Sequence, residues 1–337
     1  QTIDYYLRVI NNGNARDSIL LSLESFHPSG WTTELLDTLF NPINYVVVDP
    51  FGGMKRIILR VSAPPTAQTG ERDSSIVTGV STLNPSVSDN ATVISYVSLQ
   101  VSILVEPDTS SPIQSGQTID YYLRVINNGN ARDSILLSLE SFHPSGWTTE
   151  LLDTLGNPIN YVVVDPFGGM KRIILRVSAP PTAQAGERDS SIVTGVSTLN
   201  PLVSDNATVI SYISLQANII VEPNQEKNGL PGELIKYRVY VRNLGNAQDL
   251  IDLSITSSKG WADPQIRDTF GNLLPDMDRD GKQDVTLLPN ETKWVEVWVN
   301  IPSNAIVGVK DTTKILGESN NVSGVKDDAI LITGVLP

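Results

Sequence analysis

The sequence contains a long internal repeat, and this repeat constrains the fold more strongly than any other feature of the 337-residue chain. Residues 117–223 repeat residues 1–107 without a gap, and seven of the aligned positions differ. A repeat of this length is the size of a small domain, so each copy is expected to fold as its own unit. The seven differing pairs are Phe40/Gly156, Thr69/Ala185, Ser86/Leu202, Val97/Ile213, Val101/Ala217, Ser102/Asn218 and Leu104/Ile220.

A third, diverged copy follows the first two. Residues 243–249 (Asn-Leu-Gly-Asn-Ala-Gln-Asp) correspond to residues 127–133 (Asn-Asn-Gly-Asn-Ala-Arg-Asp), and the Gly-Trp pair at 260–261 corresponds to the one at 146–147. The sequence therefore predicts three domains, at residues 1–99, 100–215 and 216–337.

Each unit is predicted to be built from short β-strands. In residues 235–242 the apolar side chains alternate with Lys, Arg or Tyr, which is the period-two pattern of a half-buried strand. The Asn-Asn-Gly-Asn segment at 127–130 tolerates the positive φ angles of a tight turn between two strands. About seven short strands per unit, without helical periodicity, predict a β-sandwich. Further strands are expected at residues 160–165, 171–178, 190–199 and 207–216.

One motif, shared by all three units, carries a resemblance to a known family. In the third unit it covers residues 237–249, Tyr-x-Val-x-Val-x-Asn-x-Gly-Asn-x-x-Asp, and is followed by an apolar strand and the Gly-Trp pair. The motif resembles the immunoglobulin-like domains found in tandem in archaeal and bacterial surface-layer, adhesin and filament proteins. The resemblance implies an all-β fold of three tandem immunoglobulin-like β-sandwich domains, outside the cell or at its surface. It indicates function weakly, because the same module also stands beside secreted hydrolases as a spacer.

The composition argues against several functional classes. Asp and Glu outnumber Lys and Arg by 37 to 24, so binding to the phosphate backbone of a nucleic acid would begin with electrostatic repulsion. The chain has no cysteine, which removes disulfides, thiolate nucleophiles and Cys-based metal sites. No stretch approaches the roughly 18–20 apolar residues of a membrane span, and none is predicted.

The sequence offers no catalytic set, and we expect no enzymatic activity. The only histidines, His27 and His143, occupy the same position in the two near-identical units, and the third unit has no histidine there. An exposed loop histidine is the simpler interpretation. The chain also has no Gly-x-Ser-x-Gly nucleophile motif and no Gly-rich phosphate-binding loop.

An acidic loop in the third unit predicts a calcium site. Residues 276–284 (Asp-Met-Asp-Arg-Asp-Gly-Lys-Gln-Asp) place carboxylates at loop positions 1, 3, 5 and 9 and glycine at 6, a spacing that wraps a loop around a cation with oxygen ligands. Position 12 is Leu287 and not the glutamate of an EF-hand, so the loop resembles the helix-free calcium loops of thrombospondin-type repeats. The alternative is a solvated acidic loop. The predicted ligands are the side chains of Asp276, Asp278, Asp280 and Asp284 and the backbone carbonyl of Lys282.

A pair of tryptophans in the third unit predicts an interaction surface. Trp294 and Trp298 are expected on the outward face of one strand, where the second unit has Arg172 and Arg176. Tyr240 is expected on a neighbouring strand. An outward apolar patch of this kind favours a contact between subunits. A sugar-binding platform and a cover from a loop of the same domain are the alternatives.

Four Asn-x-Ser/Thr sequons predict glycosylation. Such sites are modified on the surface of secreted proteins, so they fit an extracellular location. Each lies at or near the end of a predicted strand. The sequons begin at Asn90, Asn206, Asn290 and Asn321.

The first unit lacks a segment that the other two possess. Residues 100–106 and 216–222 are each expected to form the opening strand of the following domain, whereas Gln1 aligns with Gln117, after that strand. The first sandwich is therefore expected to have an unpaired edge and an uncovered apolar strip. Either a preceding domain of a longer array supplies the strand, or a neighbouring subunit docks there and builds a filament head to tail. We expect a neighbouring molecule against residues 1–11 or their sheet edge.

These observations lead to one main functional hypothesis. The chain is expected to be a structural subunit of an extracellular filament, sheath or surface layer that associates with copies of itself, because near-identical domains suit mechanical length better than catalysis. One alternative is a cell-surface adhesin or carbohydrate-binding arm that contacts surface polysaccharide through the two tryptophans. The other is the accessory region of a secreted hydrolase.

Overall fold

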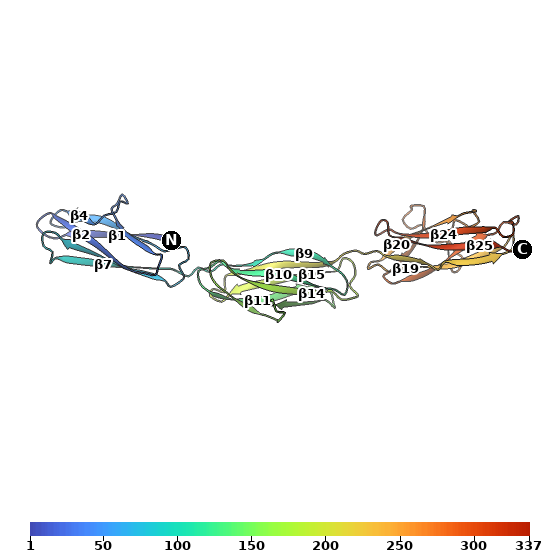
Figure 1. Ribbon diagram of the computed structural model, residues 1–337, viewed down its shortest axis with the longest axis horizontal. Coiled ribbons are helices and arrows are strands. Elements are labelled where there is room, and N and C mark those ends of the chain that lie inside the picture. Colours follow the sequence, from blue (N-terminus) through green and yellow to red (C-terminus); the bar gives the residue numbers. More distant parts are fainter.

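The computed structural model describes residues 1–337 and shows three β-sandwiches arranged in a row (Figure 1). The elements are all β-strands, which confirms the predicted all-β fold of tandem sandwiches. The structure has no helix that is long and apolar enough to cross a membrane. The first sandwich lies at one end of the row and the third at the other (Figure 1).

The second sandwich shows the complete fold of one unit. One sheet has four strands in the order β12-β14-β10-β8, and the other has five in the order β13-β11-β15-β16-β9. Neighbouring strands are antiparallel, except that β9 runs parallel to β16. The strands are β8 (Ile103–Glu106), β9 (Thr109–Ile113), β10 (Thr118–Asn127), β11 (Asp133–Phe142), β12 (Thr148–Leu152), β13 (Tyr161–Val164), β14 (Gly169–Ser178), β15 (Arg188–Ser197) and β16 (Ser204–Ile213).

The third sandwich has the same plan. Its sheets have the orders β17-β19-β23-β21 and β18-β25-β24-β20-β22, and β18 again runs parallel to its neighbour, β25. The strands are β17 (Ile219–Glu222), β18 (Gln225–Gly229), β19 (Leu234–Asn243), β20 (Asp249–Ser257), β21 (Arg267–Asp268), β22 (Gln283–Leu287), β23 (Thr292–Asn300), β24 (Lys310–Ser319) and β25 (Lys326–Val335).

The first sandwich has two strands fewer. Its sheets have the orders β1-β5-β3 and β4-β2-β6-β7, without counterparts of β8 and β9. The missing opening strand was expected from the sequence; the missing parallel strand was not. The strands are β1 (Thr2–Asn11), β2 (Asp17–Phe26), β3 (Thr32–Leu36), β4 (Tyr45–Val48), β5 (Gly53–Ser62), β6 (Arg72–Ser81) and β7 (Ser88–Tyr96).

The repeated Asn-x-Gly-Asn-x-x-Asp motif fixes the turn after the first long strand of each unit. In the second unit Asn127 is buried, and its Nδ2 donates hydrogen bonds to the carbonyls of Ala131 and Val164, while the Gly129 N–H donates to its Oδ1. Asp133 is also buried and accepts a hydrogen bond from Ser197 on β15. The motif therefore joins the two sheets by satisfying polar groups that would otherwise be buried without partners.

The second asparagine of the motif joins the second and third sandwiches to the sandwich before each of them. Asn130 Oδ1 accepts a hydrogen bond of 2.8 Å from the Gln100 N–H, and its Nδ2 donates one of 2.8 Å to the Ser98 carbonyl. The Thr69 N–H of the first sandwich donates to the Asn130 carbonyl at 3.1 Å. The second junction repeats all of these bonds with Asn246 in the place of Asn130. In both junctions, one asparagine therefore bonds to the linker and to the preceding sandwich. This residue holds the two sandwiches and the linker together.

The hydrophobic core of the first sandwich is smaller than its sequence implies. It has 8 buried apolar residues, against 20 in each of the other two. The body of the first unit, residues 1–97, differs from residues 117–213 at only four positions, Phe40/Gly156, Thr69/Ala185, Ser86/Leu202 and Val97/Ile213. The difference in burial therefore follows from the two missing strands and not from the residues of the body.

Candidate functional site

The acidic loop lies in the third sandwich and leads into β22. Asp276, Asp278 and Asp280 are exposed on the loop, whereas Asp284 lies on the strand and is fully buried. Gly281 adopts a φ of 94°, a left-handed conformation that glycine reaches without strain, so the loop can turn sharply before the strand begins. Across the sheet, Asp284 is paired in register with Asp252 of β20.

One group of carboxylates gathers within the loop. Oxygen atoms of Asp276, Asp278 and Asp284 all lie within 4.8 Å of one another. The Asp276 carboxylate accepts hydrogen bonds from two loop N–H groups, and Asp278 Oδ2 accepts one of 2.9 Å from Asn320 Nδ2. These bonds hold the two exposed carboxylates in place beside the buried one, although they add no positive charge.

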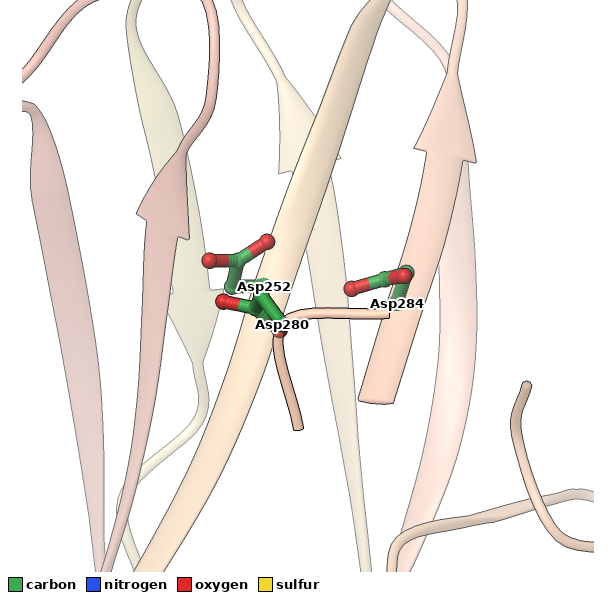
Figure 2. A group of neighbouring side chains, drawn as sticks. All are labelled: Asp252, Asp280 and Asp284. Carbon is green, nitrogen blue, oxygen red and sulfur yellow. The ribbon is translucent and has the colours of Figure 1, made fainter. Parts of the chain in front are cut away.

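A second group lies on the β20 side of Asp284. Oxygen atoms of Asp252, Asp280 and Asp284 also lie within 4.8 Å of one another, with Asp252 and Asp280 drawn beside each other in Figure 2. The Lys282 ammonium supplies a cation here, at 3.0 Å from Asp252, 3.1 Å from Glu318 and 3.7 Å from Asp280. The surrounding carboxylates, Asp252 foremost, raise the pKa of Lys282, so this ammonium stays charged. The second group therefore already has an internal counter-ion.

Burial changes the pKa values within the second group. Burial raises the pKa of Asp252 above its usual value, and the hydrogen bond from Lys282 offsets part of that shift. The Lys282 N–H holds the pKa of Asp280 below its usual value. The two carboxylates beside the same ammonium thus have opposite shifts, as expected for one that is buried and one that is solvated.

The buried Asp284 carboxylate is only half satisfied. Its Oδ2 accepts a hydrogen bond from the Met277 N–H, whereas its Oδ1 is buried and has no partner. A buried carboxylate oxygen without a partner is costly, and carboxylate oxygens at this spacing are the ligands that Ca²⁺ takes. The donor set of Asp276, Asp278 and Asp284 therefore fits a cation such as Ca²⁺.

Two acidic residues of this site, Asp252 and Glu318, were missed in the sequence, although a signal exists. In the second unit the corresponding cross-strand pair is Leu136 and Val196, whereas the third unit pairs Asp252 with Glu318. Replacement of an apolar pair by an acidic pair at one register position points to a local polar function. Neither residue lies near the loop in sequence, so a search for loop motifs does not find them.

The two predicted tryptophans lie on the outward face of β23 but differ in their surroundings. Trp294 is 48% exposed and contacts Tyr240 edge to face at 5.1 Å between ring centroids. Trp298 is partly buried, with the Lys236 ammonium 4.0 Å and the Arg267 guanidinium 4.4 Å from its ring centroid. The exposed aromatic surface is therefore Trp294 with the half-buried Tyr240 beside it, while side chains of the same domain cover Trp298.

The remaining predicted residues lie at the surface or in loops. The sequon residues Asn90 and Asn206 are exposed near the start of β7 and β16, and Asn290 is exposed in a turn with a φ of 64°. Asn321 is exposed too, but its Nδ2 donates a 2.7 Å hydrogen bond to the Gln248 carbonyl. The Nδ1 atoms of the two histidines lie 3.0 and 2.9 Å from the carbonyl oxygens of the prolines that follow them.

Comparisons with known proteins give similarity of architecture and no family. The sequence matches no protein-family model and no curated protein. The CupB6 tip adhesin of Pseudomonas aeruginosa is 7% identical, over 71% of this chain and 98% of that one, with a TM-score of 0.33. A tetra-tandem repeat from the extending region of a large adhesion protein is 11% identical, over 100% and 75%, with a TM-score of 0.30. Mouse cadherin-23 is 11% identical, over 91% and 86%, with a TM-score of 0.29. At such low scores these likenesses carry no inference about function.

Proposed function

We propose that the chain is a structural, non-enzymatic part of an extracellular filament, sheath or surface layer. The observation that supports this most strongly is the use of one junction twice in a row of sandwiches (Figure 1). A linker held by its backbone on both sides transmits force and orientation from one domain to the next better than a flexible linker does. Length and stiffness are the properties that this arrangement provides.

Contacts between copies of the chain are proposed to use the exposed aromatic surface of Trp294 and Tyr240. The two rings pack on each other at the surface, so little side-chain entropy remains to be lost when a partner covers them. Aromatic residues are enriched at the centres of protein interfaces, where they contribute most of the binding energy. A second copy of the chain is the partner that requires no further component.

Electron microscopy of the purified chain tests this proposal. Fibres, sheets or end-to-end arrays of rods are the expected result, at protein concentrations where an unrelated acidic protein of similar size stays dispersed. Monodisperse rods at all concentrations would contradict self-association and favour the adhesin alternative. Hydrolytic activity of the chain alone would contradict a structural role.

We also propose that Ca²⁺ binds between Asp276, Asp278 and Asp284 and stabilises the third sandwich. Two observations support this: the unpartnered, buried Asp284 Oδ1, and the absence of any Lys or Arg ion pair at Asp276 and Asp278. A bound cation would neutralise the carboxylates that Lys282 does not reach. Binding of this kind stabilises the folded domain by about 2.7 kcal/mol when free Ca²⁺ is about a hundred times its dissociation constant.

Single cysteines provide a domain-specific test, because the chain has none of its own. Ala183 and Ala329 are buried in the cores of the second and third sandwiches, so Ala183→Cys and Ala329→Cys report the opening of one domain each through the rate of thiol labelling. Ca²⁺ should slow labelling at position 329 by about a hundredfold under the conditions above and leave position 183 unchanged. Equal rates with calcium and with a chelator at position 329 would remove the proposal.

Two sets of substitutions then locate the cation. The double variant Asp276→Asn with Asp278→Asn should abolish the calcium effect at position 329, because both exposed carboxylates of the first group are lost. Asp280→Asn should retain most of the effect, since that carboxylate lies with Lys282. The opposite ranking would place the cation in the second group, beside Asp252.

A further inference from the structure

The first sandwich has an open groove where the other two have their opening strands. The groove has a volume of about 610 Å³ and is lined by apolar residues of both sheets, among them Leu7, Val9, Ile19 and Val77. A second hollow of about 300 Å³ lies further along the same side, against Tyr5 and Val97. In the second sandwich β8 and β9 cover the corresponding surfaces.

The side chains that line the groove also occur in the second sandwich, where the opening strand covers them. Leu123, Val125, Ile135 and Ala207 are fully buried in the second sandwich, where β8 pairs with β10 at the sheet edge and bonds to β16 of the other sheet. Their counterparts Leu7, Val9 and Ile19 are only half-buried, and Ala91 is exposed. None of the four positions that differ between the two bodies lines the 610 Å³ groove, so the groove has the same side chains as the matching surface of the second sandwich.

In the second and third sandwiches, a carboxylate accepts a hydrogen bond from the backbone of the opening strand. The matching carboxylate of the first sandwich has no such strand to bond to. Asp205 Oδ2 accepts a 2.8 Å hydrogen bond from the Val105 N–H, and Asp327 Oδ2 accepts one of 2.8 Å from the Val221 N–H. The corresponding Asp89 bonds only to the N–H of Asn90. This carboxylate is thus positioned for the backbone N–H of a strand residue that the described chain does not supply.

The first sandwich also lacks an ion pair and the junction hydrogen bonds that the second sandwich makes with its opening strand and linker. Arg124 pairs with Glu106 of β8 at 2.6 Å, whereas its counterpart Arg8 has no ion pair. Asn130 and Asn246 hold the linkers, whereas the matching Asn14 makes none of those hydrogen bonds. β1 begins at the end of the first sandwich that faces the second (Figure 1). Asn14 follows the last residue of β1, so the turn at Asn14 lies at the opposite end of that sandwich.

Two glycines show that the acceptor surface is shaped for a passing strand. A Cβ at Gly129 would lie 2.6 Å from the Gln100 carbonyl oxygen, and a Cβ at Gly195 would lie 2.9 Å from Val105 Cγ2. A side chain at either position would therefore clash with the passing segment. At the counterparts Gly13 and Gly79 these contacts are absent, and a Cβ would meet only its own sandwich, at 3.0 Å from Asn11 Oδ1 and from Ile19 Cγ2 respectively.

The other end of the row carries the complementary half of a junction. Thr69 and Ala185 donate their N–H groups to the asparagine of the next sandwich. Val307 holds the matching position in the third sandwich and is 53% exposed. The turn of Asn14 and the loop of Val307 thus match the two halves of the junctions at Asn130 and Asn246, and two such halves on different units would fit head to tail.

We propose that the groove of the first sandwich binds an extended strand with the pattern of residues 98–113, contributed by another repeat unit of this kind through the same junction. The bound strand would place apolar side chains over Gly79 and the half-buried core, give its backbone N–H to Asp89, and set its glutamate beside Arg8. Asn14 would hold the segment that enters the groove. This proposal goes beyond the structural role above, which does not depend on it.

A grafted strand tests the proposal in the full chain. A copy of residues 98–116 placed directly before Gln1 has the spacing that the second sandwich uses, and Ala67→Cys reports the opening of the first core. The graft should slow thiol labelling at position 67 by about tenfold or more, towards the rate of Ala183→Cys. The same graft with aspartate in place of its Val105 equivalent should not, because it would bury a charge. Equal rates with both grafts, or no change with either, would overturn the proposal.

Binding in trans gives an independent measurement. A synthetic peptide of residues 98–113 should bind the ungrafted chain with a stoichiometry of one, and the double variant Asn14→Ala with Asp89→Ala should weaken binding at least about tenfold. The matched control, Asn130→Ala with Asp205→Ala, changes the same residues in the filled second sandwich and should leave peptide binding unchanged. A stoichiometry of two, or equal effects of the two variants, would overturn the proposal. Neither outcome bears on assembly by electron microscopy, so failures of the two proposals are distinguishable.

Discussion

The two near-identical sandwiches allow one substitution to be compared in a filled and an open core. Leu123 is fully buried between the sheets of the second sandwich, and Leu7 is the same residue in the first, where it lines the groove. We compare Leu123→Ala in a chain that carries Ala183→Cys with Leu7→Ala in a chain that carries Ala67→Cys. In each chain, the rate of thiol labelling at the cysteine reports the opening of that sandwich. Both pairs have the same local sequence, so differences in helix or strand propensity and in the unfolded chain cancel.

The expected magnitudes follow from burial. Leu123→Ala removes a fully buried side chain and leaves a closed cavity, which costs about 3 kcal/mol within the usual range for such changes. Leu7→Ala removes a half-buried side chain that faces open space, so it loses roughly half of the transfer free energy and creates no closed cavity, about 1 kcal/mol. The difference of about 2 kcal/mol is a factor of about 30 in the opening equilibrium.

Thiol labelling under native conditions measures both opening equilibria in the full chain. Each variant is compared with its own cysteine parent, so the different starting stabilities of the two sandwiches do not enter. Equal losses at the two positions would refute the reasoning, because they would mean that the first core is closed without a bound strand. With the grafted strand in place, the cost of Leu7→Ala should rise towards that of Leu123→Ala.

Two further predictions concern the surface and acid stability. Trp294→Arg, which installs the residue found at the matching position of the second unit, should change the free energy of unfolding by less than about 0.5 kcal/mol and abolish assembly in electron microscopy; normal assembly of this variant would contradict the proposed interface. The hydrogen bonds from Arg176 hold the pKa of Asp120 below its usual value, so this carboxylate adds stability above the unfolded-state pKa of about 3.9 that is lost as the pH falls through its lower folded-state pKa. Denaturant midpoints at pH 7 and pH 3 should therefore differ less in Asp120→Asn than in the parent chain, and an equal difference would contradict this assignment.

The sequence predicts most of the fold because its strands carry local signals. Alternation in residues 235–242 and the apolar segments at 103–106 and 219–222 identify strands without reference to the rest of the chain. The parallel strands β9 and β18 were missed, because Thr109–Ile113 and Gln225–Gly229 are mostly polar and each buries only its last residue fully. Their pairing is decided by the strand they lie against, which the local sequence does not show.

The candidate calcium site also has one part that the local sequence shows and another part that depends on residues distant in the sequence. The spacing of Asp276, Asp278, Asp280 and Asp284 is local, so the loop could be identified from sequence. The placement of Asp280 with Lys282 depends on Asp252 and Glu318, which approach only through the register of β20 with β22 and β24. The cover of Trp298 depends in the same way on Arg267, from a segment about 30 residues earlier.

The connection between two sandwiches and the folding of the second one are coupled in this chain, because the segment that joins the two sandwiches is also part of the second one. Residues 98–100 bind the junction asparagine, and the strand that follows them completes the core of the next sandwich. A flexible spacer would leave the core of each domain independent of its neighbour. Here, pulling the linker away would expose Val105 and the core beneath it, so resistance to extension and stability of the following sandwich have the same physical origin. If the chain has the proposed structural role, each junction would resist extension for as long as the sandwich that follows it stays folded.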